Sequence, residues 1–417
     1  VDLLKSLVWL CARVPDAELA RALTALAVSA YRKIPGKGPR LVVLGNACVT
    51  ALGMMPGMPA LGAIALLKVK VKFGTAQKEI DKALTSAAER EGLPRDEIEE
   101  LGVPAYGLEE VGYRREVFGA FVAELLVDGE DAEIRWSKVD GGALKSVPSA
   151  VKRDHAEDWK ELQDSSKDIG RMLTAQRERI DSLFLARKSW PYSVWRERYF
   201  DHPLVGTIAR RLIWTFTHGT TSRSGCGPAG VILGRDDQPL EGLGPETVVI
   251  PWHPIDHSTD EVLAWRAWLE GKVVRQPFKQ AHREVYVLTD AERRTHVYSN
   301  RFASHVLRQH QYHALCAARG WRDKLRLMVD DSFPPTSRDL PEWGLRAEYW
   351  VEGVGDEYGR DTNDSGVYLY LTTDQVRFYP ISAAQRQAHA SGGGYRASAG
   401  PAEADVEPVP LDQIPAL

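Results

Sequence analysis

The sequence feature that most constrains the fold is a run without any charged side chain, residues 41–67. A transmembrane helix needs about 20 apolar residues, so this run is long enough to cross a bilayer. The segment Pro56-Gly57-Met58-Pro59 interrupts it, however, and leaves two pieces of about a dozen residues each. Each piece has the length of a buried helix, so the sequence predicts two core helices and no membrane span.

The first 95 residues show short helical patterns that Pro and Gly separate. The expected helices cover residues 2–13, 16–31, 38–54, 59–71 and 75–90. We predict that residues 1–95 form a helical-repeat-like region of HEAT-like helical hairpins, an architecture that typically binds other proteins. The chain opens at Val1 rather than at a methionine, and we expect it to be an internal piece of a longer protein, cut at both ends.

The sequence pattern over residues 96–417 predicts four further parts. Residues 96–150 form a small β-containing unit with a hairpin turn at 140–142, because the pattern alternates over 118–147. Residues 151–190 form one long helix, since apolar side chains recur at steps of three and four. Residues 191–382 form an α+β domain. Residues 383–417, which are rich in Gly and Pro, form a flexible linker or tail. The fold class is therefore α+β and multidomain.

Within the α+β domain, the pattern predicts two helices and a set of antiparallel strands. The first helix covers 258–270, with a capping box of Ser258 and Glu261 and with Gly271 at its end. The second covers 301–319, after Asn300. The expected strands are 211–217, 229–233, 247–251, 284–288, 324–329, 345–351, 367–371 and 375–379, with turns at 363–366 and 373–374.

Charge and cysteine content narrow the function. The chain holds 53 Lys and Arg residues against 57 Asp and Glu, a net charge of −4, so no global field attracts nucleic acid or an anionic membrane. The four cysteines lie far apart without a CxxC pair, which argues against a disulfide framework or a zinc ribbon. We expect reduced thiols in the cytoplasm, and neither a metal nor a cofactor.

A candidate polar cluster is the strongest hint of chemistry. It draws on the dense polar run at 276–286 and on one basic face of the predicted helix at 301–319. Its members are Lys279, His282, Arg283, Glu284, Arg301, His305 and Arg308. Such side chains supply a base and anion clamps in an active site, but equally a structural ion-pair network or a solvated helix face. The sequence leaves these alternatives open.

Other motifs favour structural interpretations. His253, Asp256 and His257 lie in a Pro-containing loop without helical spacing, which favours plain loop residues over a metal site. His310 and His313 fall on the predicted buried stripe of their helix and are expected to be core or half-buried histidines. Residues 361–366 begin like a calcium loop, but its twelfth position is not a carboxylate, which favours a hairpin turn.

Several stretches together resemble a bacterial family called domain of unknown function 4132. They are YRKIPG at 31–36, HPLV at 202–205, RLIW at 211–214, the run at 276–286 and RFASHVLRQ at 301–309. The resemblance extends over residues 31–379 and is strongest over 276–379. That family is similar to the molybdate metabolism regulator MolR, whose relatives often carry a WGR module. The resemblance implies no settled activity and no catalytic residues, and no WGR signature is visible here.

These observations support three functional hypotheses. The first is a cytoplasmic regulatory or scaffold protein whose helical front binds a protein partner and whose α+β domain binds a small anionic ligand through Arg301 and Arg308. The alternative is an enzyme that acts on a nucleotide or another phosphorylated substrate through the cluster around Glu284 and Arg308. A nucleic-acid-associated regulator is the weakest of the three, because the net charge is negative and no groove-reading motif is present.

Overall fold

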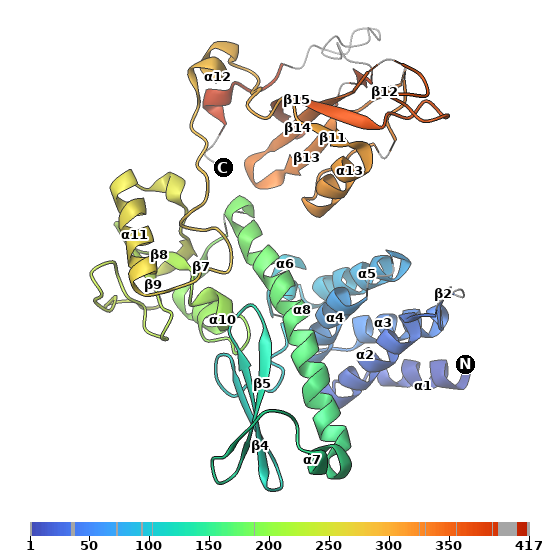
Figure 1. Ribbon diagram of the computed structural model, residues 1–417, viewed down its shortest axis with the longest axis vertical. Coiled ribbons are helices and arrows are strands. Elements are labelled where there is room, and N and C mark those ends of the chain that lie inside the picture. The colour runs from blue at the N-terminus through green and yellow to red at the C-terminus, as the bar shows by residue number, and fades with distance from the viewer. Residues whose placement is uncertain are drawn as a thin grey trace. The chain divides into compact units, whose positions relative to one another are not determined.

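The chain forms two compact units in the computed structural model (Figure 1). One comprises Val1–Leu183 with Lys188–Arg283, and the other Phe184–Arg187 with Glu284–Leu417. The structure describes residues 2–34, 38–71, 74–92, 95–101, 103–186, 188–324, 326–329, 331–355, 357–385, 387–390 and 407–414. Helices dominate the N-terminal part and antiparallel strands the C-terminal part, which confirms the α+β prediction.

The helical front of the first unit is a stack of helices that pack on one another (Figure 1). They are α1 (Asp2–Cys11), α2 (Ala17–Tyr31), α3 (Val42–Met54), α4 (Met58–Lys70), α5 (Gly74–Glu91) and α6 (Arg95–Leu101), and two short strands, β1 (Lys33–Ile34) and β2 (Gly38–Pro39), lie between α2 and α3. The uncharged run is α3 and α4, as predicted, and Leu44, Leu52 and Ile64 are buried in their core. Among the described residues, no helix is long and apolar enough to cross a membrane. The HEAT-like character of the stack stays a prediction.

A four-stranded antiparallel sheet follows, with its strands in chain order. Its strands are β3 (Tyr113–Phe118), β4 (Phe121–Val127), β5 (Ala132–Lys138) and β6 (Ala143–Leu144). The predicted turn at 140–142 joins β5 to β6, and Gly141 supplies the positive φ of 96° that this turn requires.

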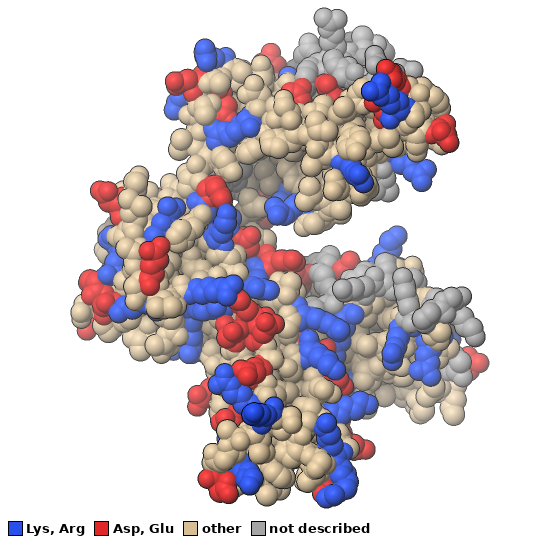
Figure 2. Space-filling view, in the orientation of Figure 1, with Lys and Arg blue, Asp and Glu red and all other residues tan. Residues whose placement is uncertain are grey.

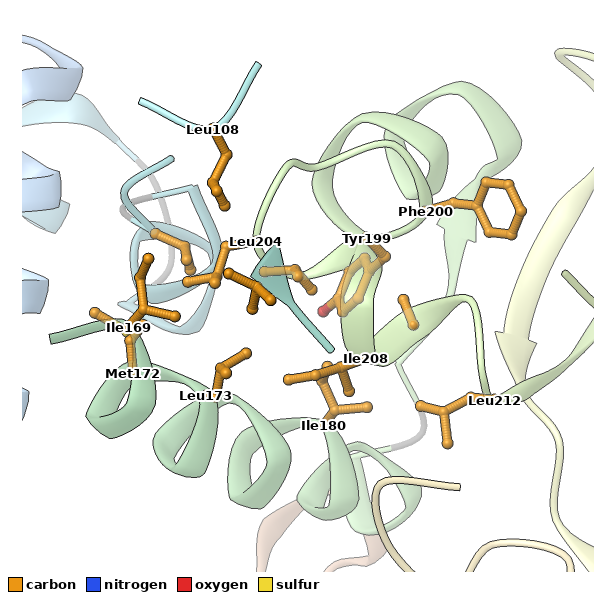
Figure 3. Close-up of a cluster of buried hydrophobic side chains, with 14 of the residues drawn as sticks. Leu108, Ile169, Met172, Leu173, Ile180, Tyr199, Phe200, Leu204, Ile208 and Leu212 are labelled. Atoms are coloured by element: carbon orange, nitrogen blue, oxygen red, sulfur yellow. The ribbon is translucent and has the colours of Figure 1, made fainter. Parts of the chain in front are cut away.

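The predicted long helix is interrupted at His155, so α7 (Ser149–Asp154) precedes α8 (Ala156–Ala186). The apolar seam of α8 is buried, as its spacing predicts. Figure 3 shows Ile169, Met172, Leu173 and Ile180 of this helix facing Tyr199, Leu204, Ile208 and Leu212. The helix α8 therefore forms one wall of the main core of the unit.

The second sheet of this unit has the order β7-β10-β8-β9. The elements are β7 (Trp190–Pro191), α9 (Tyr192–Trp195), a π-helix η1 (Arg196–Phe200), α10 (Gly206–Ala209), β8 (Ile213–His218), β9 (Thr221–Cys226), β10 (Val248–Pro251), a 3₁₀ turn η2 (Pro254–Asp256) and α11 (Thr259–Gly271). The predicted strand at 229–233 is wrong: only Leu233 makes isolated bridges there, to Cys226 and to Pro239. The predicted strand at 211–217 begins two residues late, because the Leu212 amide still donates to Ala209 after α10.

The second unit is built on the sheet β11-β15-β14-β13, beside a two-stranded pair β12-β16. Its elements are α12 (Asp290–Thr295), β11 (Val306–Arg308), α13 (Gln309–Ala318), β12 (Ser332–Phe333), β13 (Thr336–Leu340), η3 (Pro341–Trp343), β14 (Leu345–Gly353), β15 (Tyr370–Pro380), β16 (Ala388–His389) and η4 (Leu411–Gln413). The turn at 363–366 is present, since the Gly366 amide donates to the Asn363 carbonyl at 2.9 Å.

Four strand predictions in this unit need correction. The stretches 367–371 and 375–379 are not separated by a turn at 373–374, because β15 runs through it. The register of the pairing between β14 and β15 shifts between Tyr349 and Val351 of β14, and this shift accommodates the break in the alternating sequence pattern. Among the described residues of 284–288 and 324–329 there is no strand beyond an isolated bridge at Met328.

Parts of the predicted tail 383–417 pack against other elements of the second unit, to which they belong. The Ala390 carbonyl accepts from the Gly353 amide at 2.8 Å, and the Val409 amide donates to Phe378 at 2.8 Å. Leu411 is buried. Residues 391–406 and 415–417 lie outside the described residues.

A buried carboxylate joins the helical front to the rest of the first unit. Glu100 of α6 is 1% exposed. Its oxygens lie 3.0 Å from Arg198 Nη1, 3.4 Å from Arg179 Nη1, 3.6 Å from Lys188 Nζ and 3.2 Å from Trp190 Nε1, and accept a hydrogen bond from the Tyr199 hydroxyl. Burial raises the pKa of Tyr199, so this hydroxyl stays a neutral donor at physiological pH. The three cations come from α8, from the segment before β7 and from η1.

We expect Glu100→Gln to lower the free energy of unfolding by about 3 kcal/mol, because it leaves buried cations without their counter-charge. Urea unfolding followed by tryptophan fluorescence measures this. Glu97→Gln is the matched control, one turn earlier on α6: its side chain is 28% exposed and lies 2.8 Å from Arg198 Nη2. The control substitution should lower the free energy of unfolding by less than about 1 kcal/mol. Equal effects of the two variants would contradict the structural role of Glu100.

His202 is a buried histidine whose ring is held by three backbone groups. Its Nδ1 accepts from the Leu204 and Val205 amides, each at 3.1 Å, and its Nε2 lies 3.1 Å from the Val103 carbonyl. The neutral ring with its proton on Nε2 satisfies all three contacts. Burial lowers the pKa of His202, because the charged ring is poorly solvated there.

The folded state therefore resists a proton that the unfolded chain takes up below about pH 6.5. We expect the free energy of unfolding to fall as the pH decreases from 7 to 5. His202→Asn should make this slope shallower but not flat, because burial also lowers the pKa of His253. His218→Asn, at an exposed position, should keep the wild-type slope. A His202→Asn slope equal to that of the wild type would show that His202 does not carry the effect.

Candidate functional site

The predicted polar cluster is divided between the two units. Lys279, His282 and Arg283 belong to the first unit, and Glu284, Arg301, His305 and Arg308 belong to the second. Basic and acidic side chains both occur across the face of each unit shown in Figure 2. Each part of the cluster is therefore considered within its own unit.

In the first unit, the polar run at 276–283 fastens the second sheet. The Gln280 side chain is 1% exposed. Its Oε1 accepts from the Ile213 amide at 2.8 Å, and its Nε2 donates to the carbonyls of Ile213 at 2.7 Å and Trp252 at 3.0 Å. Gln276 Nε2 in turn donates to Gln280 Oε1 at 2.9 Å. Arg283 pairs with Asp181 of α8. Three of the polar residues that make this run conspicuous in the sequence, Gln276, Gln280 and Arg283, thus have a structural role.

In the second unit, the predicted helix at 301–319 begins only at Gln309, so Arg301, His305 and Arg308 do not share a helix face. Ser304 adopts a φ of 63°, which breaks any helix, and its amide donates to Thr373 at 2.7 Å. The strand β11 then pairs with β15. Sheet pairing overrides the helical periodicity of this segment, and the buried residues of α13 are Gln309, Tyr312 and Cys316 instead of the predicted stripe.

Two members of the cluster in the second unit, Arg301 and His305, have local partners. Arg301 Nη2 lies 2.5 Å from Glu292 Oε2 and 2.6 Å from the Val287 carbonyl. Its guanidinium also lies over the Tyr286 ring, 5.2 Å from the centroid. Hydrogen bonds, among them that from Arg301, lower the pKa of Glu292 despite its burial, so this pair is ionised. His305 Nδ1 lies 3.2 Å from the Phe302 carbonyl. These contacts match the structural ion-pair alternative.

Three of the other histidines, His253, His257 and His313, have local partners. His253 Nδ1 accepts from the Ile255 amide at 3.1 Å, and the His257 ring stacks on Trp252 with a centroid distance of 4.9 Å. His310 is exposed, contrary to its predicted place on a buried stripe, whereas His313 is half-buried and pairs with Asp323. Within the part of the chain that the structure describes, no three His, Cys, Asp or Glu residues are grouped to hold a metal ion.

The buried cysteines are poor nucleophiles. Burial raises the pKa of Cys226 to about 12 and that of Cys316 to about 11. Both are therefore protonated thiols at neutral pH, and the thiolate is the reactive form.

A groove at the C-terminal end of α11 collects two members of the predicted cluster. We call it the α11 groove. It has a volume of about 700 Å³ and is lined by Leu269, Glu270, Val273, Val274, Arg275, Gln276, Phe278, Lys279 and His282. Its walls combine apolar side chains with the basic side chains of Arg275 and Lys279 and the ring of His282. Ligand sites are usually concave and largely apolar, with a few polar groups that fix orientation.

Of the residues that line this groove, the sequence singled out Lys279 and His282 but not the apolar wall. Gly271 was expected to close the helix from just outside it, but it is the last residue of α11, and Val273 takes the left-handed position with a φ of 56°. The Val273 amide donates to the Glu270 carbonyl at 3.0 Å. A β-branched residue is strained in this conformation. Its side chain is 88% exposed, so burial of apolar surface does not offset the strain. The order Gly-Lys-Val-Val at the end of the helix was the signal in the sequence that could have indicated this conformation.

Val273→Gly should therefore raise the free energy of unfolding by about 1 kcal/mol, because glycine adopts a positive φ without strain. A matched thermal unfolding series measures this. Val274→Gly is the control: the neighbouring residue has no positive φ and is partly buried, so its replacement should destabilise the chain. A lower unfolding temperature for Val273→Gly than for the wild type would contradict the strain.

Comparison with known families identifies one likeness. The family model described as Domain of unknown function (DUF4132) matches residues 141–321. This span supports the resemblance for the part of the chain that contains α8, the β7-β10-β8-β9 sheet, α11 and the α11 groove. Searches of curated proteins and of solved structures find no match.

Proposed function

We propose that the chain is a non-enzymatic regulatory or scaffold protein of the cytoplasm, in which the helical front binds a helix of a partner protein. The supporting observation is an apolar row on α1. Leu3, Leu7 and Leu10 are 76%, 51% and 72% exposed. Solvent exposure of three leucines on one short helix is unfavourable unless another surface covers them.

The spacing of the row indicates what kind of surface covers it. Leu3, Leu7 and Leu10 are separated by four and then three residues, which places them in one line along the helix. This is the spacing with which one α-helix packs against another. The buried residues Val8 and Ala12 project to a different side, and α1 packs on α3. The row is thus separate from the contact that holds α1 in the stack, and it fits the apolar face of a partner helix.

The enzyme alternative has less support. Arg301 and Arg283, which it needs as anion clamps, are each held by a carboxylate. The likeness to MolR-type regulators that the family resemblance implies agrees with a regulatory role, and we include it in the proposal.

The proposal is tested with Leu7→Gln combined with Leu10→Gln, which removes two of the three leucines of the row but keeps good helix formers. Proteins that the wild-type chain captures are identified by mass spectrometry, purified and titrated calorimetrically against both chains. We expect the double variant to bind the partner at least about tenfold more weakly, because two buried leucines contribute a few kcal/mol. Arg13→Gln, at an exposed position just beyond α1, should leave the affinity unchanged.

Two outcomes would contradict the proposal. One is an identified partner that binds both chains equally well. The other is a concentration-dependent dimer of the wild-type chain, seen by sedimentation velocity and lost in the double variant, because a second copy would then occupy the row.

A further inference from the structure

The α11 groove brings two kinds of surface together. One is apolar: Val273 and Phe278 lie on its wall, beside Leu269 and Val274. Val273 lowers the stability of the fold, because its backbone is strained and its side chain is exposed. Strain of this kind tends to persist at ligand sites. The side chain that it holds at the groove is available to a ligand.

The other surface is basic. Arg275, Lys279 and His282 line the groove against a single acidic residue, Glu270. Arg275 Nε lies 3.2 Å from Glu130 Oε1, but the Arg275 side chain is 81% exposed, so this ion pair is weak in water. Lys279 and His282 are exposed. The charge of the lining therefore favours an anion.

We propose that the α11 groove binds a small organic anion with an apolar body, such as an aromatic or aliphatic carboxylate. The volume of about 700 Å³ lies in the range of small-molecule sites. Val273 and Phe278 contact the apolar body, and Lys279 and His282 hold the anionic group. The site lies in the first unit and uses none of the second-unit arginines, Arg301 and Arg308, that the sequence suggested for an anion.

The groove is distinct from the α1 row, so this inference does not depend on the partner-binding proposal. Because an apolar probe can also adhere to exposed leucines, the two surfaces must be separated by experiment. The Leu7→Gln and Leu10→Gln chain serves this purpose, since it removes two of the three leucines of the row and keeps the groove.

The probe is 2-naphthoate, compared with its neutral analogue 2-naphthalenemethanol, and binding to the full chain is followed by saturation-transfer NMR and calorimetry. We expect saturable binding of 2-naphthoate with a Kd near or below about 1 mM, and at least about tenfold weaker binding of the alcohol. The double leucine variant should bind 2-naphthoate like the wild type.

Three substitutions then separate the two surfaces of the groove. Lys279→Gln should weaken the binding of 2-naphthoate roughly fivefold and leave the affinity for the alcohol unchanged, as expected for the loss of one partly solvated charge. Val273→Gly should weaken the binding of both probes while it stabilises the fold. A loss of binding in this variant therefore does not reflect a loss of structure. Lys160→Gln, an exposed lysine on α8, is the matched charge control and should change neither probe.

The proposal is overturned if the alcohol binds as tightly as 2-naphthoate, if Lys279→Gln and Lys160→Gln behave alike, or if binding disappears in the double leucine variant. Absence of saturable binding of 2-naphthoate at millimolar concentration would overturn it as well.

Discussion

The first unit depends on one buried carboxylate and the cations around it. Glu100 lies outside the span that matches the family model, whereas Arg179, Lys188 and Arg198 lie inside it. Buried cations without an anion are strongly destabilising, so the matched span needs this carboxylate from α6 to fold as it does. A second pair, Lys70 of α4 with Asp168 of α8, joins the same two regions. The physical folding unit is therefore larger than the matched span.

The sequence predicted those elements whose signals are local and agree with one another. The uncharged run broken by Pro56-Gly57 became α3 and α4, and the Ser258 hydroxyl caps α11 by accepting from the Glu261 amide at 3.2 Å. In both cases composition, periodicity and punctuation indicate the same structure. The long seam of α8 is predicted for the same reason, although His155 separates it from α7.

The failures occur where a distant partner decides the conformation. Residues 301–308 have a helical pattern, yet β11 pairs with β15, more than 60 residues away in sequence, and Ser304 turns the chain. The polar run at 276–283 suggested a reactive or ligand-binding site. In the structure, however, Gln280 forms hydrogen bonds with backbone groups of Ile213 and Trp252 at the end of the sheet. A single sequence does not reveal which backbone groups such side chains will satisfy.

The candidate site shows the same division between local and long-range causes. Lys279 and His282 were selected for their chemistry, and both line the α11 groove. The apolar wall was missed because Gly271 was expected to close the helix from just outside it, whereas Gly271 is the last residue of α11 and Val273 takes the left-handed position. Had Gly271 taken that position, the residue there would have no side chain, and the wall would lack its exposed apolar element. The strain at Val273 is thus inseparable from the shape of the groove, and a glycine that relieves it removes the surface that a ligand would contact.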